Sequence, residues 1–402
     1  MSMVIDLFRK YIHIPSASRE DTHQKPSTPE QLDMARALEE DMLKMGLADV
    51  RSDGHGYVYG RVPANAEKQS AIGLIAHIDV VDNEPCAPMN EKIVSSYDGS
   101  ELYIGNGVTL SCEKYPAMKD WIGKDLIVTD GRTILGADDK AGVAEIMALA
   151  YRLINDKSIK HGDVLLAFTP DEEIGAGAAD LDIPAFGAEF AYTVDGGTLG
   201  EVEYENFNAA SARISFTGTA IHPGAAKDHM KNAALMAAEF ASMLPDAETP
   251  AHTEKREGFY HLVNIEGVTE RASLTYILRD HDAQKLDQKK QMLNALADII
   301  NLRYGESVCS VQIREQYRNM REVMESRMDI VKRAADAFES CGVTPVFPPV
   351  RGGTDGAQLS FRGLPCPNLS TGSINHHGRS ECACVQDMEK MVDVLTEIVR
   401  AR

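Results

Sequence analysis

The sequence predicts an α/β fold: a mixed, mostly parallel sheet with helices on both faces, plus an inserted α+β lid domain of split-βαβ (ferredoxin-like) topology. Two observations support this prediction. Short apolar runs alternate with helical patterns before residue 205 and again near the end of the chain, which is typical of buried parallel strands. Between these regions, the order β-α-β-β-α-β predicts a self-contained sandwich. We therefore expect a discontinuous main domain of residues 1–205 and 320–402, interrupted by a lid domain of residues 206–319.

The main domain is predicted to open with two helices and a pair of strands. Apolar residues repeat at helical spacing in residues 3–12 and 29–46. Two strands are expected in residues 50–62 and 70–80. Residues 84–132 are rich in glycine, proline and charge, which predicts an irregular excursion near the functional site.

Regular structure is predicted to resume after this excursion. Residues 134–154 carry one apolar helical face, which begins directly after Asp138 and Asp139. Strands are then expected at residues 165–169 and 190–194.

The lid domain is predicted from a change of pattern after Tyr204. Its expected strands and helices follow the split-βαβ order. They are a strand at 210–220, a helix at 232–244, two strands within 259–280, a helix at 285–305 and a strand at 309–318.

Composition and charge limit the classes of partner. The chain has 402 residues, of which 44% are apolar, so it can bury a sizeable core. Its 41 basic and 61 acidic residues give a net charge of −20, which disfavours nucleic acid and anionic membranes as partners. Charged residues interrupt the apolar pattern of residues 1–16, and the chain has no apolar run of about 18 residues. We therefore expect a cytoplasmic protein with no nucleic-acid or membrane partner.

Potential metal ligands follow four of the apolar runs. The runs end at His77, at Asp171, Glu172 and Glu173, at Asp195, and, after a short loop, at His377. Because the carboxyl ends of parallel strands lie at one edge of a sheet, these side chains should meet. With Asp138 they predict a two-metal hydrolase site, since imidazole and carboxylate groups bind zinc. Taken singly, Asp138 could instead cap the following helix, and Glu172 and Glu173 could form a solvated turn.

Several motifs together resemble the peptidase T family, the tripeptide aminopeptidase branch of the di-zinc aminoacylase and carboxypeptidase metallopeptidases. They are AHIDV, GADDKAGVAEIM, AFTPDEE, YTVDGG, ENFNAAS, EGFYHL, RGGTDGAQLSF and GLPCPN. The similarity runs from near residue 1 to near the C-terminus. It implies a zinc-peptidase catalytic domain with a lid, and release of the N-terminal residue from tripeptides. A metal-bridging water, activated by a glutamate general base, would attack the peptide bond.

The resemblance also implies a role for each residue of the site. His77 and Asp195 would bind one Zn²⁺ ion, Glu173 and His377 the other, and Asp138 would bridge the two. Co²⁺ or Mn²⁺ could replace zinc, because ligand type selects only loosely among these metals. Asp79 would orient the imidazole of His77 by accepting its second N–H. Glu172, which is not needed as a ligand, would be the general base.

The choice of the last metal ligand is ambiguous, because two histidines are adjacent. We choose His377 over His376 because the family's ligand is followed directly by glycine, here Gly378, and then by a glutamate, here Glu381. The resemblance further implies a cis peptide bond between Asp138 and Asp139.

Three residues outside the metal set are expected to contact substrate. His222 resembles the family's histidine that stabilises the tetrahedral oxyanion. Arg279 and Arg351 are candidates for binding the C-terminal carboxylate of the peptide, because guanidinium matches carboxylate in a two-pronged pair. A turn histidine and two ordinary ion-pair arginines remain the alternatives.

Other functions stay open at this point. A di-zinc dipeptidase or an N-acyl-amino-acid amidohydrolase would use the same site. A catalytically silent, metal-stabilised binding protein would not need Glu172 or Asp79. A nucleotide-binding protein is disfavoured, because GADDKAG and DGGTLG lack the glycine spacing of phosphate-binding loops. The expected partners are small peptides and, through the lid domain, a second copy of the chain.

Overall fold

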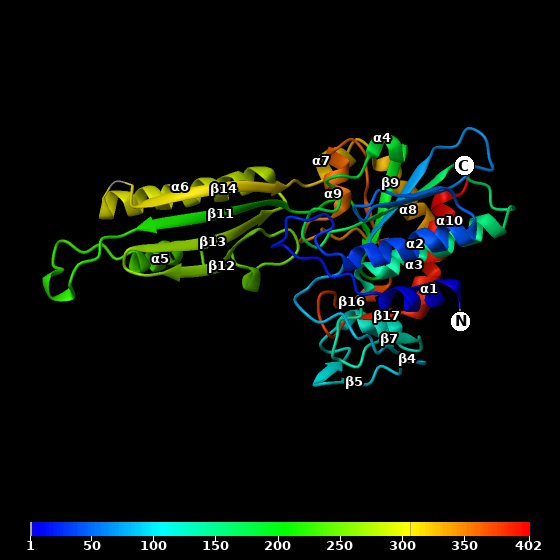
Figure 1. Cartoon of the computed structure of the whole chain (residues 1–402), viewed down its shortest axis with the longest axis horizontal. Helices are drawn as coiled ribbons and strands as arrows, with labels where there is room; N and C mark the ends of the chain where they lie inside the picture. Colours follow the sequence, from blue (N-terminus) through cyan, green and yellow to red (C-terminus); the bar gives the residue numbers. More distant parts are fainter. Residues whose placement is uncertain (1, 306) are drawn as a thin grey trace. The chain divides into compact units, whose positions relative to one another are not determined.

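A computed structural model describes residues 2–305 and 307–402 (Figure 1). The chain divides into two compact units. Unit 1 comprises Met1–Tyr204, Glu322–Pro348 and Thr354–Arg402, and unit 2 comprises Glu205–Arg321 and Pro349–Gly353. The predicted limits of the folding domains lie close to these boundaries and stay a prediction. The short segment 349–353 packs with unit 2, although it lies in the C-terminal part of the sequence.

A seven-stranded mixed sheet forms the centre of unit 1. Its strands, in spatial order, are β1 (Ala48–Ser52), β2 (Val58–Val62), β8 (Val164–Thr169), β3 (Ile72–His77), β9 (Phe190–Gly196), β15 (Asn368–Ser370) and β10 (Val202–Glu203). The four central strands run parallel, and the outer strands β1, β2 and β10 pair antiparallel. The predicted mixed, mostly parallel sheet is confirmed.

Helices cover both faces of this sheet. Helix α3 packs against β3 and β9, and α10 packs against α3. Successive side chains of a strand point to opposite faces of the sheet. On the other face, Ile75 of β3 and Ala191 of β9 pack with Phe186 of α4 and Leu359 of α9. The helices of unit 1 are α1 (Met3–Ile12), α2 (Glu30–Met45), α3 (Ala137–Asn155), α4 (Ile183–Phe186), α8 (Met328–Ser340), α9 (Asp355–Phe361) and α10 (Val385–Val399), and α7 (Arg321–Met324) crosses the unit boundary.

One predicted strand proves to be two. Residues 50–62 contain the end of β1, a turn and β2, which pair as an antiparallel hairpin. The turn holds Gly54 and Gly56 at φ values of 79° and 96°, a conformation that other residues rarely adopt. The glycines, rather than the apolar pattern, therefore mark the reversal of the chain.

The excursion at residues 84–132 is more ordered than predicted. It contains β4 (Lys92–Val94), β5 (Leu102–Gly105), β6 (Val108–Leu110), the 3₁₀ helix η1 (Pro116–Trp121) and β7 (Leu126–Val128). Strands β16 (Ser373–Ile374) and β17 (Cys382–Cys384) join β7 and β4 in a small sheet, whose core holds the buried Trp121 and Met118. Strands of three or four residues are too short to show a period in the sequence.

Unit 2 is a four-stranded antiparallel sheet with two helices. The elements are β11 (Asn208–Thr217), η2 (Pro223–Ala225), α5 (Ala233–Ser242), η3 (Pro250–His252), β12 (Phe259–Gly267), β13 (Arg271–Asp280), α6 (Ala283–Tyr304) and β14 (Cys309–Tyr317), with strand order β12-β13-β11-β14. Ile214, Phe216 and Leu274 of the sheet pack with Phe240 of α5 and Ile300 of α6. The chain order β-α-β-β-α-β confirms the predicted split-βαβ topology (Figure 1).

Within the described residues, no helix has both the length and the apolar character needed to cross a membrane. The cytoplasmic location stays a prediction.

A half-buried acid at the edge of the large sheet, Glu203, gives a testable stability effect. Asn368 Nδ2 donates to Glu203 Oε2 at 2.7 Å, and Asn368 Oδ1 is buried without a hydrogen-bond partner among the described residues. Burial raises the pKa of Glu203 to about 8 from an ordinary value of 4.5. Between these two pH values the folded protein holds a proton that the unfolded chain has lost, so the free energy of unfolding falls as the pH rises.

We expect Glu203→Gln to stabilise the metal-free protein by about 2 kcal/mol at pH 9 and by much less at pH 5. This is below the full value of the pKa shift, because the side chain is partly exposed. The new amide can also donate to Asn368 Oδ1. Urea unfolding at both pH values measures the effect, with the exposed Glu189→Gln as control. A gain that does not grow with pH would contradict the prediction.

Candidate metal centre

The candidate ligands lie where the central strands end. His77 is the last residue of β3, and Asp195 lies near the end of the parallel strand β9. Glu172 and Glu173 follow β8 after Pro170, and Asp138 lies at the start of α3. Because β3, β8 and β9 run parallel, their carboxyl ends share one edge, as the sequence predicted.

Two groups of ligand atoms share the carboxylate of Asp138. His77 Nε2 lies 2.9 Å from Asp138 Oδ1 and 3.3 Å from Asp195 Oδ1. His377 Nε2 lies 3.0 Å from Asp138 Oδ2 and 3.0 Å from Glu173 Oε2. In each group the three ligand atoms lie within 4.8 Å of one another, a spacing that could hold a metal ion.

The second histidine, His376, is also close to this set. Its Nδ1 lies 3.5 Å from Asp138 Oδ2, while its Nε2 is 2.8 Å from the hydroxyl of Ser373. It contacts only one of the candidate ligands, whereas His377 contacts two. The geometry therefore favours His377 as the ligand and leaves His376 as a neighbour of Asp138.

Acidic groups dominate the electrostatics of the site. Burial raises the pKa of Glu172 well above its ordinary value, and raises that of Glu173 to about 7. Hydrogen bonds to Asp138 and Glu173 raise the pKa of His377 to about 11. Burial acts to lower the pKa of His77, but its acidic neighbours raise it well above the ordinary value. Without cations, the site thus retains protons that offset the charge of its carboxylates.

The carboxylate of Asp79 holds the loop that carries the two glutamates. Its Oδ1 accepts the backbone N–H of Glu172 at 3.0 Å, and its Oδ2 accepts that of Glu173 at 3.1 Å. His77 Nδ1 is closer to the backbone oxygen of Asp79, at 3.0 Å, than to its carboxylate, at 3.4 Å. Asp79 therefore contacts both the imidazole and the glutamate loop, a double contact that the sequence did not predict.

Four further acids support the site and were not recognised as such from the sequence. Asp139 Oδ2 accepts the backbone N–H of His77 at 3.1 Å, and the Asp138–Asp139 peptide bond is cis, as expected. Asp171 accepts bonds from Ser27 and Gln31, and Asp355 accepts one from Thr169 at 2.8 Å. The fourth, Glu381, accepts three backbone N–H groups. Asp139 and Asp171 carry a signal in the sequence, since each directly precedes or follows a candidate site residue, and Glu381 carries one through the family motif that begins at His377. Asp355 carries none of these signals.

The three expected substrate contacts lie in unit 2. His222 is exposed, and its Nδ1 accepts the backbone N–H of Gly224 at 3.1 Å. Arg279 Nη1 donates to Gln316 Oε1 at 2.9 Å, and its guanidinium stacks on the ring of Tyr317 at 5.1 Å. The substrate roles of these residues stay predictions.

Arg351 is held by its own unit. Its Nη1 donates to the backbone oxygens of Lys255 and Glu257, at 2.8 and 3.0 Å, and its Nη2 donates to Thr253. The guanidinium also lies 5.1 Å from the ring of Phe207. These contacts secure the loop at residues 253–257, so binding a carboxylate would require some of them to be exchanged.

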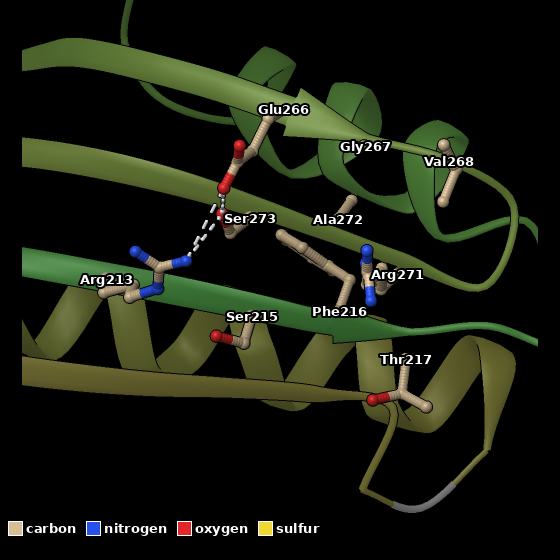
Figure 2. Close-up of a pocket in the computed structure, with 10 residues that line it drawn as sticks. All are labelled: Arg213, Ser215, Phe216, Thr217, Glu266, Gly267, Val268, Arg271, Ala272 and Ser273. Carbon is tan, nitrogen blue, oxygen red and sulfur yellow. Dashed lines mark hydrogen bonds and ion pairs between the residues drawn. The ribbon is translucent and has the colours of Figure 1, made fainter.

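Unit 2 also has a polar pocket of about 580 Å³ at one end of its sheet (Figure 2). Arg213 Nη2 donates to the hydroxyl of Ser273 at 3.2 Å and lies 3.6 Å from Glu266 Oε1. None of the candidate site residues lines this pocket. We assign it no part in the chemistry.

A family model and solved structures show which fold the chain has. The M20 peptidase dimerisation domain model matches residues 204–305. Aminopeptidase PepT from Bacillus cereus ATCC 10987 has a similar fold, with a TM-score of 0.79 and 22% identity, over 99% of this chain and 97% of that one. A dinuclear metal-binding M20 peptidase from Bacillus subtilis gives a TM-score of 0.64 and 12% identity, over 98% and 96%. The chain therefore has the fold of the M20 peptidases.

Sequence comparison then gives the family. Peptidase T from Clostridium perfringens strain SM101 is 47% identical over 401 residues, which cover 100% of this chain and 99% of the relative. This chain belongs to the peptidase T family, and it is a peptidase.

Proposed function

We propose that the protein is a zinc-dependent aminopeptidase that releases the N-terminal residue from tripeptides. The observation that carries the proposal is the position of Asp138, whose two carboxylate oxygens face two different imidazoles at 2.9 and 3.0 Å. A carboxylate placed in this way can bridge two metal ions. The family, and the aminopeptidase named among the proteins of similar fold, support a peptide substrate.

The chemistry of the donor set fits two zinc ions. We propose His77 and Asp195 as ligands of one ion, Glu173 and His377 as ligands of the other, and Asp138 as the bridge. Imidazole nitrogen and carboxylate oxygen are both ordinary zinc donors. Glu173 Oε1 is buried and has no hydrogen-bond partner among the described residues, which leaves it available to a cation. Two divalent ions would also neutralise the negative charge of the buried carboxylates.

In this proposal the protein's own residues move the proton. When bound, the two ions would polarise the peptide carbonyl and lower the pKa of water. Asp79 holds the backbone of Glu172 and Glu173, so the carboxylate of Glu172 stays beside the ligands. A carboxylate oxygen of Glu172, Oε1 or Oε2, takes a proton from the attacking water and delivers it to the leaving nitrogen.

Three residues of unit 2 are proposed to complete the substrate site. His222 would stabilise the oxyanion, and Arg279 and Arg351 would bind the C-terminal carboxylate of the tripeptide. In support, both arginines lie close to the same residue of unit 2, Phe259. Phe259 pairs with Arg279 across the sheet, and its ring lies 5.6 Å from the guanidinium of Arg351.

A homodimer through unit 2 is also part of the proposal. Val263 and Ile265 on the edge strand β12 are more than half exposed, and so is Leu235 of α5. Unit 2 has 15 acidic and 15 basic residues, so unit 1 carries the whole net charge of −20 and charge does not oppose contact between two copies of unit 2. Light scattering that gives the mass of a single chain would refute the dimer.

Product analysis by mass spectrometry tests the function. Zinc-loaded protein is incubated with a tripeptide, its N-acetylated form, its C-terminal amide and the matching dipeptide. We expect release of only the N-terminal residue, from the free tripeptide, and loss of this activity with a chelator.

The other substrates separate the alternatives. Cleavage of the acetylated peptide or of the dipeptide in preference to the tripeptide would indicate an amidohydrolase or a dipeptidase. If the C-terminal amide were cleaved as well as the free tripeptide, Arg279 and Arg351 would not bind the C-terminal carboxylate. No cleavage of any substrate by protein that holds two zinc ions would indicate a catalytically silent chain.

A further inference from the structure

The buried carboxylate of Glu381 is bonded to the backbone at Asp138, the candidate bridging ligand. The residue is 1% exposed and directly precedes β17. Its Oε2 accepts the backbone N–H groups of Leu135 and Gly136, at 2.8 and 2.7 Å, and its Oε1 accepts that of Asp138 at 3.0 Å. Leu135 and Gly136 belong to the loop that leads into α3, and Asp138 lies in the irregular first turn of that helix. A single buried side chain thus accepts the N–H of the candidate bridging ligand and two N–H groups that precede it.

The loop is shaped to hold an anion. Gly136 has a φ of 72°, which turns successive N–H groups toward one point, and such concave sets of donors bind negative charge. Burial raises the pKa of Glu381, whereas His376 and the N–H donors act against this shift. The donors match a carboxylate, which has only acceptors to offer.

Glu381 also belongs to the segment that carries the last ligand. It follows His377 by four residues, and the N–H of Glu381 donates to the backbone oxygen of Gly378 at 3.0 Å. The next residue, Cys382, pairs with Val128 of β7, the strand that leads toward the loop at residues 135–138. The side chain and the strand pairing together tie the His377 segment to the Asp138 loop.

We propose that Glu381 is a positioning residue that fixes Asp138 relative to His377, and so sets the geometry in which the second metal ion is held. It touches neither metal nor substrate and acts through the backbone of Asp138. This inference rests on the proposed metal centre. Groups that orient metal ligands typically change metal affinity by about 10–100-fold when they are replaced.

Glu381→Gln is the most informative variant, because it keeps the shape of the side chain and replaces one of its two acceptor oxygens by an NH₂ group. The amide oxygen can accept either the Leu135 and Gly136 pair or the Asp138 donor, but not both. The amide NH₂ group then faces a backbone N–H, and two donors in contact leave both unsatisfied.

Glu145→Gln is the matched control. Glu145 lies on α3 in the same unit, is fully buried, and has no hydrogen-bond partner for either carboxylate oxygen among the described residues. The two variants therefore make the same chemical change at two buried sites, and only one of these sites contacts the Asp138 loop.

The experiment is a titration of metal-free protein with Co²⁺, followed by its absorption spectrum and by the metal content after gel filtration. We expect the wild type and Glu145→Gln to bind two Co²⁺ ions with the same spectrum. We expect Glu381→Gln to bind one of the two about 10–100-fold more weakly, with an altered spectrum.

Each outcome of the titration supports or overturns the positioning role of Glu381. Equal affinity and an equal spectrum for Glu381→Gln and wild type overturn this inference alone. A wild-type chain that takes up no Co²⁺ overturns both this inference and the proposed metal centre. If Glu381→Gln does not fold, Gly136→Ala perturbs the same loop from the donor side. Residue 136 has a φ of 72°, which strains an alanine, and the added Cβ would lie 3.3 Å from Val80 Cγ1. Unchanged Co²⁺ binding in that variant would likewise overturn the inference.

Discussion

Glu172→Gln is expected to retain both metal ions and the fold, and to lose activity by about 10²–10⁴-fold, the usual contribution of a positioned general base. The amide keeps the shape of the side chain but cannot take a proton from water. The backbone N–H of Glu172, which donates to Asp79, is unaffected by the change. We therefore expect kcat to fall, while KM and metal content stay near the wild-type values.

The control for this experiment is Glu189→Gln, an exposed glutamate of the same unit. Turnover at saturating tripeptide is measured for both variants, together with zinc content by mass spectrometry. If Glu172→Gln with two bound ions kept activity near that of the wild type, Glu172 would not be the general base, and the proton would have to move through another group.

Asp138→Ala is expected to abolish activity by a different route, the loss of metal. One carboxylate serves both candidate groups, so its removal takes a ligand from each. We expect less than two zinc ions per chain and little stabilisation by added zinc. A ligand at 100 times its dissociation constant stabilises a folded protein by about 2.7 kcal/mol, so the wild type should show a clear rise in melting temperature.

Metal-free samples provide the necessary comparison for Asp138→Ala. Without zinc, the variant should melt lower than the wild type. Burial acts against the charged form of Asp138, but His376, His377 and His77 hold its pKa well below the ordinary value, so the charged carboxylate stabilises the metal-free fold. The loss of metal is therefore read from the rise in melting temperature that zinc causes in each protein. The exposed Asp246→Ala should behave as wild type in both conditions. Two tightly bound zinc ions in Asp138→Ala would refute the bridging role.

The sequence could predict where the candidate ligands meet, because they lie at the ends of apolar runs or at the start of a helical pattern. His77 and Asp195 lie at the ends of buried strands, and Asp138 precedes a long amphipathic helix. The side on which parallel strands end is a property of the topology, so predicting the strands also brought these side chains together. The order of the strands and helices in unit 2 could be predicted from the alternation of strand and helix patterns along the chain.

The supporting contacts could not be predicted, because no local pattern encodes them. The bond between Glu381 and the N–H of Asp138 joins residues 243 positions apart, and that between Ser27 and Asp171 joins residues 144 apart. Each involves a side chain and a backbone group, and a backbone donor leaves no trace in the choice of residue. The pairing of β4, β7, β16 and β17 into a small sheet was not predicted for a related reason, since these strands have only two or three residues.

The distribution of the ligands along the chain governs when the centre can form during synthesis. His377 comes 239 residues after Asp138, and the whole of unit 2 up to Arg321 lies between them. At about 5–20 residues per second, the ribosome needs on the order of tens of seconds to cover that distance. Once Asp195 has been made, the nascent chain has the donors of the first candidate group but not those of the second. In the proposed centre, capture of a second ion would therefore wait until the segment that carries His377 has folded against the rest of unit 1.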